Sequence, residues 1–374
     1  MARPFTLLIK PAGPDCNLTC EYCFYTCKSS LFGPGAHRMS EAILDCLMKS
    51  YLGLRFPISS FAWQGGEPAL MGLDFYQYAI DLQKQYGADG QAVSNVFQTN
   101  GILLDDAWCK FLAEYKFLCG ISLDGPKEFH DYYRKDRTGQ GTFDRVWAGI
   151  ERCRRHGTEF NILVLLNDRN VNHPDELFDF FTSQDLLYLQ FIPCIEKNSN
   201  DPVQPAAYSI TPEQYGRFLC RFFDRWYDGW SGKMSVRIFD SLVSYGVNGF
   251  PAECTFGRQC NDYIVIEHNG NVYCCDFYVT PETQLGNILE TPIEQIAIHP
   301  VKRKFSAKKT EIANKCLVCR YLDICRGGCL KDRSMLTGAH TTPSYFCESY
   351  KMFFDHALGY LRGLAVQVQK QRGK

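Results

Sequence analysis

Short runs rich in β-branched and aromatic residues alternate with helical patterns over the first half of the chain. The apolar runs occupy residues 6–10, 59–63, 95–99, 117–122, 161–165 and 188–191. Helix-start residues stand between them, with Ser40, Asp105 and Thr142 each just before a helical pattern. Because strands that alternate with helices pair in parallel, the six repeats predict a partial (β/α)6 TIM-like barrel. Reactive groups in such folds lie on loops at the carboxyl ends of the strands.

A loop-rich and cysteine-rich segment follows the last repeat. Before it, Thr211 to Gln214 predicts a capping box that opens a helix. Within it, the sequence YIVIEHNGNVYCC predicts one hairpin with Asn269-Gly270 as its two-residue turn. A small segment of this kind has little core of its own, so we expect metal to hold it together. We therefore expect two domains, at residues 1–235 and 236–374.

Composition and charge exclude several classes of protein. The chain has 374 residues, of which 45% are hydrophobic, with 40 Lys and Arg against 41 Asp and Glu. The net charge of -1 provides no general field for binding nucleic acid or anionic membranes. The apolar runs are far too short to span a bilayer, and the first residues lack a signal-peptide pattern. We expect a cytoplasmic monomer that binds neither nucleic acid nor membrane.

Nineteen cysteines are the most unusual feature of the composition. Cytosolic thiols are kept reduced, so structural disulfides are not expected. Most of these cysteines lie between Cys16 and Cys27 or between Cys254 and Cys347, which predicts metal or cluster ligation. The others fall in helix or strand patterns, where we expect small buried hydrophobic residues. They are Cys46, Cys109, Cys119, Cys153, Cys194 and Cys220.

The first group places Cys16, Cys20 and Cys23 on one short loop after the first predicted strand. Three thiolates at this spacing can bind three corners of an iron-sulfur cluster. Cys27 is one possible fourth ligand, which gives a closed zinc or electron-transfer site. A ligand from outside the protein is the other, which leaves one iron open for chemistry. Spacing alone does not decide between them.

The second group contains eight well-spaced cysteines. They are Cys254, Cys260, Cys275, Cys316, Cys319, Cys325, Cys329 and Cys347. Eight thiolates are enough for two fully ligated four-iron clusters. The C-x2-C pair within the group also suits tetrahedral zinc, so both interpretations stay open.

The first loop resembles the signature of the radical S-adenosylmethionine superfamily, a C-x3-C-x2-C triplet with an aromatic residue, here Tyr22, before its last cysteine. Gln64-Gly65-Gly66-Glu67-Pro68, after the second predicted strand, resembles a second family motif. The resemblance implies a four-iron cluster whose open iron binds S-adenosylmethionine and cleaves it to a 5'-deoxyadenosyl radical. The positions that match the family's cofactor contacts are Tyr22, Gly65, Gly66, Glu67, Ser122, Arg134 and Ile195.

The second cysteine group resembles the SPASM domain, most closely that of the anaerobic sulfatase-maturating enzymes. This resemblance implies two auxiliary four-iron clusters. One is assigned to Cys254, Cys260, Cys275 and Cys329, and the other to Cys316, Cys319, Cys325 and Cys347. Asp276 matches the family's proposed general base, and Gln64 and Tyr25 are expected to line the substrate pocket. Cys27 and Cys274 lie outside the family motifs.

The resemblance implies oxygen-independent oxidation of a Cys or Ser of a sulfatase to Cα-formylglycine. The radical removes a hydrogen atom from Cβ, Asp276 takes the proton from sulfur or oxygen, and an electron leaves through the nearer auxiliary cluster. The implied partners are the sulfatase polypeptide and an electron donor such as ferredoxin or flavodoxin. One alternative is a related enzyme that forms thioethers or crosslinks in a ribosomal peptide. Another is a non-catalytic iron-sulfur or zinc protein, which leaves the GGEP motif, Ser122 and Arg134 without a role.

Overall fold

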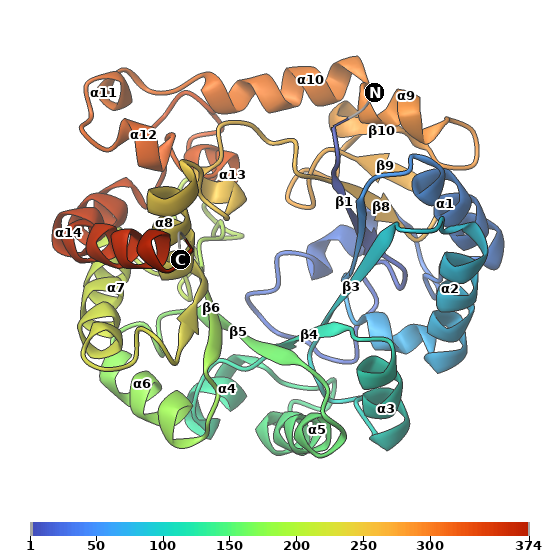
Figure 1. The fold of residues 1–374 in the computed structure, drawn as a ribbon, viewed down its shortest axis with the longest axis horizontal. Helices are drawn as coiled ribbons and strands as arrows, with labels where there is room; N and C mark the ends of the chain where they lie inside the picture. Colours follow the sequence, from blue (N-terminus) through green and yellow to red (C-terminus); the bar gives the residue numbers. More distant parts are fainter. Residues whose placement is uncertain (1–2, 373–374) are drawn as a thin grey trace. The chain divides into compact units, whose positions relative to one another are not determined.

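The computed structural model describes residues 3–372, apart from the side chains of residues 26 and 27 (Figure 1). The chain divides into two compact units. The first unit comprises Met1–Ser122, Asp131–Phe160 and Asn261–Ser306. The second comprises Leu123–His130, Asn161–Cys260 and Ala307–Lys374. Each unit therefore combines segments from both halves of the chain, and the domain boundary at residue 235 stays a prediction.

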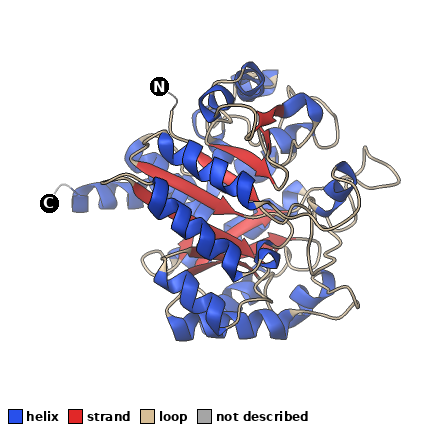
Figure 2. Cartoon of the chain, turned by 90° about the vertical axis from the view of Figure 1, so that its right-hand side faces the viewer, coloured by secondary structure: helices blue, strands red, loops and turns tan. Residues whose placement is uncertain are grey.

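The first unit is built on a mixed sheet whose strand order is β10-β9-β8-β1-β2-β3-β4. Its strands are β1 (Thr6–Lys10), β2 (Ile58–Trp63), β3 (Ala92–Thr99), β4 (Leu118–Ser122), β8 (Tyr263–Glu267), β9 (Asn271–Tyr273) and β10 (Gln284–Asn287). Its helices are α1 (Glu41–Gly53), α2 (Leu73–Tyr86), α3 (Asp106–Glu114), α5 (Phe143–His156), α9 (Ile293–Ala297) and α10 (Pro300–Ala307). Strands β1 to β4 are parallel, and Figure 2 shows helices lying over the strands.

The predicted hairpin is confirmed as β8 and β9, which pair antiparallel around a turn where Gly270 has a φ of +83°. Strand β8 also pairs in parallel with β1, in a register that places Lys10 opposite Glu267. Ile264, Val265 and Ile266 are completely buried in this sheet. The expectation that metal rather than a core holds this segment is therefore wrong for the hairpin.

The second unit contains the parallel strands β5 (Phe160–Leu166), β6 (Tyr188–Pro193) and β7 (Ser235–Val236). Its longer helices are α6 (Pro174–Ser183), α7 (Pro212–Tyr227), α8 (Arg237–Asn248) and α14 (Cys347–Arg372). Its short elements are η3 (Cys254–Phe256), η5 (Lys308–Thr310), α11 (Asn314–Leu317), α12 (Leu322–Cys325) and α13 (Leu330–Ser334), and α4 (Lys127–Tyr133) begins in it. Phe353 of α14 packs against Phe223 of α7 and Phe239 of α8, and the predicted capping box of α7 is confirmed.

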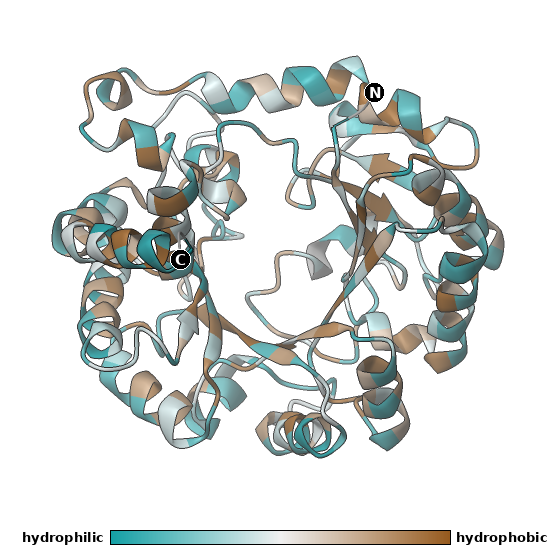
Figure 3. Ribbon diagram, in the orientation of Figure 1, coloured by the Kyte–Doolittle hydropathy of each residue, from teal (hydrophilic) through white to brown (hydrophobic). Residues whose placement is uncertain are grey.

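All six predicted strands are strands in the structure, and Figure 3 shows hydrophobic residues along them. Among the remaining cysteines, Cys109, Cys119, Cys153 and Cys194 are buried as predicted, whereas Cys46 and Cys220 are half-buried. In the described part of the chain, no helix is both long and apolar enough to cross a membrane.

Candidate active site and cluster-binding segments

The cysteine triplet lies on the loop that follows β1, at the carboxyl end of the strand. Cys16, Cys20 and Cys23 are all half-buried, and the Cys23 N–H donates to the Cys20 carbonyl oxygen at 3.1 Å. Burial and the nearby charge of Glu67 raise the pKa of Cys16 to about 12. The thiol of Cys16 therefore stays protonated unless a cation lies beside it. A bound metal is such a cation, and it deprotonates the thiol that coordinates it. The side chain of Cys27 lies outside the described residues.

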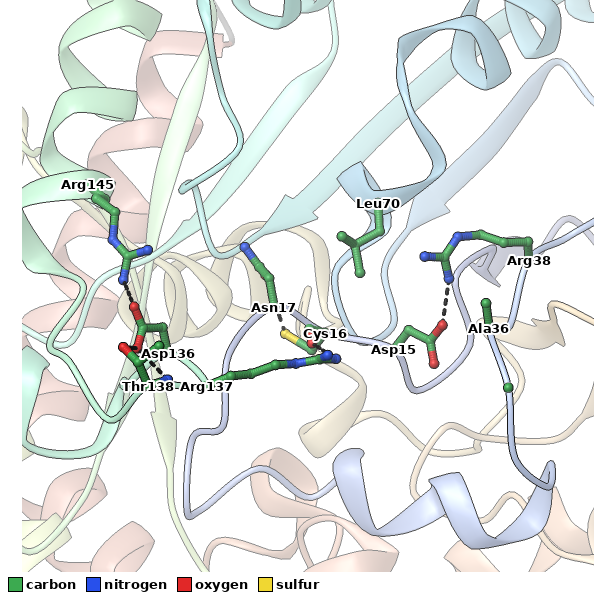
Figure 4. Close-up of a pocket in the computed structure, with 11 residues that line it drawn as sticks. Asp15, Cys16, Asn17, Ala36, Arg38, Leu70, Asp136, Arg137, Thr138 and Arg145 are labelled. Atoms are coloured by element: carbon green, nitrogen blue, oxygen red, sulfur yellow. Dashed lines mark hydrogen bonds and ion pairs between the residues drawn. The ribbon is translucent and has the colours of Figure 1, made fainter.

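A pocket of about 630 Å³ opens beside Cys16 (Figure 4). Asp15 on its wall pairs with Arg38 at 2.6 Å, and Arg137 Nη2 donates to the Cys16 carbonyl oxygen at 2.8 Å. Asp136 pairs in turn with Arg145 at 2.6 Å. These contacts fix the backbone of the cysteine loop from the side that faces the pocket.

The GGEP motif comes directly after β2 and contacts the cysteine loop through its backbone. The Gly66 N–H donates to Gly13 O at 2.9 Å, and the Glu67 N–H donates to Asp15 O at 2.7 Å. A Cβ atom on Gly66 would lie only 1.9 Å from Asp15 O. Gly66 is therefore required by its close approach to the cysteine loop, a reason that the sequence did not reveal.

Glu67 is completely buried, and burial raises its pKa to about 7. Its carboxylate accepts hydrogen bonds from Thr99 Oγ1 at 2.7 Å and from the Asn100 N–H at 2.8 Å, as well as from the Ala69 N–H. These bonds join the carboxyl ends of β2 and β3. A positioning role therefore fits Glu67 better than direct contact with a cofactor.

The other predicted cofactor contacts are distributed over both units. In the first unit, Tyr22 and Arg134 are buried, with the Arg134 guanidinium 5.5 Å from the centre of the Tyr22 ring. Ser122 ends β4 and is half-buried. In the second unit, Ile195 follows β6 and is completely buried, and its carbonyl oxygen accepts a hydrogen bond from Lys331 Nζ at 2.8 Å.

Asp276 lies in a buried polar cluster of the first unit. Its Oδ2 is 3.7 Å from Lys10 Nζ, and its Oδ1 accepts a hydrogen bond from Tyr263 OH at 3.2 Å. Lys28 Nζ donates to its backbone oxygen at 2.5 Å. Asp276 is 7% exposed and Lys10 is 0% exposed, so their charges interact with little screening by water. Tyr263 OH also lies 3.1 Å from Cys275 Sγ, which puts Asp276 beside a predicted cluster ligand.

The two predicted substrate residues belong to the same cluster. Lys10 Nζ donates to Gln64 Oε1 at 2.5 Å and lies 4.5 Å from the centre of the Tyr25 ring. Tyr25 OH lies 2.7 Å from both carboxylate oxygens of Glu267. The structure therefore brings Gln64, Tyr25 and Asp276 together around Lys10.

Sequence reasoning missed Lys10 and Glu267, which occupy the last positions of β1 and β8. A signal was present, because each is a charged residue that ends an apolar strand, in TLLIK and YIVIE. In barrels, functional residues lie at the carboxyl ends of the parallel strands, and a charged side chain at such an end is a candidate. What the sequence could not show was that β1 and β8 are neighbours.

Four cysteines of the second unit line one pocket. They are Cys316, Cys319, Cys325 and Cys347. Aromatic residues Tyr321, Tyr350 and Phe354 complete much of its wall. Burial raises the pKa of Cys325 to about 11, so this thiol also favours its neutral form until a metal binds.

The other predicted set is divided between the units. Cys275 belongs to the first unit, whereas Cys254, Cys260 and Cys329 belong to the second. Cys254 is exposed and the other three are half-buried, while Cys274 is buried. Among the described residues, no three Cys, His, Asp or Glu side chains are arranged to bind a single metal ion.

Comparison with known proteins decides the family. The family model of the "Radical SAM superfamily" matches residues 11–181, and that of the "Iron-sulfur cluster-binding domain" SPASM matches residues 254–320. The serine-type anaerobic sulfatase-maturating enzyme of Bacteroides thetaiotaomicron is 36% identical, over 99% of this chain and 94% of its own length. The chain belongs to the anaerobic sulfatase-maturating enzyme family.

Two further comparisons support the assignment. The cysteine-type enzyme of Clostridium perfringens is 35% identical, over 98% of this chain and 100% of its own length. A solved structure described as native anSMEcpe with bound AdoMet and Cp18Cys peptide has a TM-score of 0.90 at 34% identity, covering 98% of this chain and 100% of that one. The predicted resemblance and fold class, a partial barrel followed by a SPASM-type domain, are confirmed.

The donor sets of this family member fit the groups that the family assignment implies. Three cysteines on a loop suit a four-iron cluster with one open iron, and four around a pocket suit a fully ligated cluster. Gly66 supports the first of these sites, because it lets the GGEP motif lie against the loop that carries the three cysteines.

Proposed function

We propose that this protein is a radical S-adenosylmethionine oxidoreductase that converts a Cys or Ser of a sulfatase to Cα-formylglycine without oxygen. Three four-iron clusters and S-adenosylmethionine are its cofactors, with Cys16, Cys20 and Cys23 at the first cluster. S-adenosylmethionine bound there supplies a 5'-deoxyadenosyl radical, which takes a hydrogen atom from Cβ of the target residue. The substrate is a sulfatase polypeptide, and similar identity to serine-type and cysteine-type relatives supports both targets.

The observation that carries this proposal is the buried cluster around Asp276. Oxidising a Ser side chain to an aldehyde requires removal of the hydrogen atom on Cβ, the proton on oxygen and one further electron, which an auxiliary cluster would accept. A Cys target loses the proton on sulfur instead, and water then hydrolyses the thioaldehyde to the aldehyde with release of hydrogen sulfide. Asp276 is buried, and its Oδ2 lies 3.7 Å from Lys10 Nζ, so a carboxylate oxygen that can accept a proton is held in the buried cluster. We assign Asp276 as the general base.

The remaining residues of the cluster orient the substrate. Gln64 donates through Nε2 to Gln98 Oε1 at 2.6 Å and accepts from Lys10, so its amide is fixed in one orientation. Tyr25 is fixed by Glu267. Fixed polar groups and a buried site limit access of water to a reactive radical. We assign Gln64 and Tyr25 to the walls of the substrate pocket.

The assignment also covers the second pocket and the partners. Cys316, Cys319, Cys325 and Cys347 hold one auxiliary cluster, and Cys254, Cys260, Cys275 and Cys329 hold the other. Tyr22, Gly65, Gly66, Ser122, Arg134 and Ile195 surround S-adenosylmethionine, and Glu67 positions the motif. An electron donor such as ferredoxin or flavodoxin reduces the first cluster, and the protein acts as a cytoplasmic monomer.

The experiment is an anaerobic assay of the reconstituted, reduced protein with S-adenosylmethionine and three peptides. The peptides carry one sulfatase motif with Cys, Ser or Ala at the target position, and mass spectrometry follows the peptide and 5'-deoxyadenosine. We expect an aldehyde from the Cys or Ser peptide and none from the Ala peptide. Formation of 5'-deoxyadenosine with unchanged peptides would favour the alternative enzyme that crosslinks ribosomal peptides. Protein that contains all three clusters but makes no 5'-deoxyadenosine would favour the electron-transfer alternative.

A further inference from the structure

Two buried cations of the second unit form no direct ion pair with a carboxylate of the described residues. Lys309 is 1% exposed and Arg333 is 2% exposed. Lys309 Nζ donates to the carbonyl oxygens of Gly328, Thr255 and Cys254, at 2.5, 2.8 and 3.4 Å. Arg333 likewise donates to backbone carbonyl oxygens, which belong to Gly327, Lys309, Glu311, Arg326 and Gly328. Among the described residues, neither cation lies within ion-pair distance of an Asp or Glu.

Burial of an uncompensated charge is costly, and most proteins avoid it by pairing the charge or by neutralising it. Lys331 of the same unit follows the first route, since it pairs with Glu196 at 2.6 Å. The guanidinium of Arg333 cannot follow the second route, because it stays protonated in proteins. Carbonyl dipoles satisfy its hydrogen bonds but add no net negative charge. Asp332 interacts electrostatically with Lys309, but no described carboxylate pairs directly with Lys309 or Arg333. Negative charge in direct reach of these two cations is therefore missing.

The residues that could supply this charge are cysteines from both predicted auxiliary sets. Arg333 contacts the carbonyl oxygens of Gly327 and Gly328, and Lys309 contacts that of Gly328. These two glycines lie between Cys325 and Cys329 in the chain. Electrostatic interaction links Lys309 to Cys325 and Cys329. It also links Arg333 to Cys260, Cys316, Cys325 and Cys329. A four-iron cluster with four thiolate ligands carries net negative charge and gains another negative charge on reduction.

We propose that Lys309 and Arg333 are the built-in counter-ions of the two auxiliary clusters and that they raise the clusters' reduction potentials. The inference rests on the proposed function only in assigning these cysteines to iron-sulfur clusters. A fixed positive charge in a low-dielectric interior stabilises the reduced, more negative state over the oxidised state. The carbonyl oxygens of the Gly327–Gly328 turn hold both cations at a set place, so their effect does not depend on mobile side chains.

The test compares Lys309→Gln with the wild-type protein, both fully reconstituted without oxygen. Glutamine keeps donors for the carbonyl oxygens but removes the charge. Redox titration followed by electron paramagnetic resonance should show the auxiliary clusters about tenfold harder to reduce at a given potential, which is a shift of about 59 mV for a one-electron couple. The first cluster, whose signal responds to S-adenosylmethionine, should keep its potential.

Three further variants make the result specific. Lys309→Arg keeps the charge and should restore the potentials. Lys308→Met removes the neighbouring, half-buried lysine and should change the potentials much less, because solvent screens its charge. Lys309→Met repeats the loss of charge if the glutamine variant binds less iron.

Unchanged auxiliary potentials in a charge-removing variant with full iron content would overturn the inference. The formylglycine assay on the same preparations separates this result from failure of the proposed function. Active enzyme with unchanged potentials overturns the counter-ion role alone, whereas wild-type protein without auxiliary clusters overturns the cluster assignment and the counter-ion role together.

Discussion

Two buried carboxylates, Asp276 and Glu267, lie near each other in the first unit, but their surroundings differ. Both oxygens of Glu267 lie within hydrogen-bond distance of Tyr25 OH, and burial raises the pKa of Glu267. Asp276 has its Oδ2 toward Lys10 without a short hydrogen bond, which leaves this oxygen available to a substrate proton. This difference supports our proposal that Asp276 removes the substrate proton, and we expect Glu267 to position Tyr25.

Replacement of Asp276 by Asn should separate radical formation from aldehyde formation. General-base catalysis contributes about 10²- to 10⁴-fold, so we expect Asp276→Asn to slow formylglycine formation by that factor. Cleavage of S-adenosylmethionine should continue, since the described contacts of Asp276 are with Lys10, Tyr263 and Lys28 and with none of the cysteine triplet. The measurement is the ratio of aldehyde to 5'-deoxyadenosine in single-turnover reactions.

Glu267→Gln is the matched control for that variant, because it removes a neighbouring buried carboxylate and keeps an acceptor for Tyr25. We expect it to lower the ratio less than Asp276→Asn does. A larger loss in Glu267→Gln than in Asp276→Asn would show that the roles of the two carboxylates are reversed.

Site residues that belong to a sequence motif could be predicted from the sequence. Site residues that meet only through long-range folding could not. Cys16, Gly66 and Asp276 follow predicted strands or the predicted hairpin, so their loops could be placed from the chain pattern. Lys10 and Glu267 are more than 250 residues apart in the sequence and meet only through the β1–β8 register. Long-range strand pairing of this kind leaves no local signal.

The loop after β2 is fixed to the loop after β1 by backbone contacts that only glycine permits. Adding a methyl group in Gly66→Ala would place a carbon 1.9 Å from Asp15 O, so one of the two loops must move. We expect this variant to lose the first cluster while both auxiliary clusters remain. Iron content should fall by about one cluster's share, and S-adenosylmethionine cleavage should be abolished.

Gly53→Ala is the control, because a Cβ atom there meets nothing within 4 Å. It should retain full iron content and activity. If Gly66→Ala also retained its first cluster, the two loops would have to be more adaptable than their contacts indicate.

Helix α10 carries a buried lysine whose ionisation opposes folding. Lys302 is 4% exposed and lies 4.9 Å from the centre of the Phe5 ring, and burial lowers its pKa from 10.5 to about 8. At pH 7 the lysine is charged in the folded protein, at a cost of at most about 3 kcal/mol at 1.36 kcal/mol per pKa unit. Lys302→Met should therefore raise the midpoint of thermal unfolding at pH 7.

The pH dependence checks the cause. Between pH 8 and 10.5 the unfolded chain keeps the proton that folded Lys302 has lost, so wild-type stability rises with pH in this range. The advantage of Lys302→Met should shrink over the same range, while the exposed Lys304→Met on the same helix should show no such trend. A constant difference between wild-type protein and Lys302→Met would exclude ionisation as the cause.

At the scale of the molecule, the strand pattern predicted the parallel strands because each strand is locally apolar and bounded by helix signals. It did not predict that the β8–β9 hairpin extends the sheet beside β1, because nothing in the hairpin specifies its partner. The two units consequently differ in what stabilises their cysteines. The hairpin beside Cys275 is supported by buried Ile264 and Val265. By contrast, four of the five cysteines after residue 307 lie on or beside the very short helices α11, α12 and α13, and Cys347 begins α14.

Removal of the clusters should therefore loosen the two cysteine-rich regions unequally. Helices α11, α12 and α13 have four, four and five residues, far below the roughly 12 to 15 that a helix needs to be stable alone. Loss of the clusters would also remove the negative charge that we propose balances Lys309 and Arg333. Hydrogen exchange on protein stripped of iron should show lost protection at residues 307–346, while β1 and β8 stay protected.

Helix α14 should keep most of its protection beyond its first turn, because Phe353 packs between Phe223 and Phe239. Two results would contradict this prediction: uniform loss of protection over both units, or unchanged exchange at residues 307–346. Either would show that residues 307–346 do not depend on metal more than the rest of the chain does.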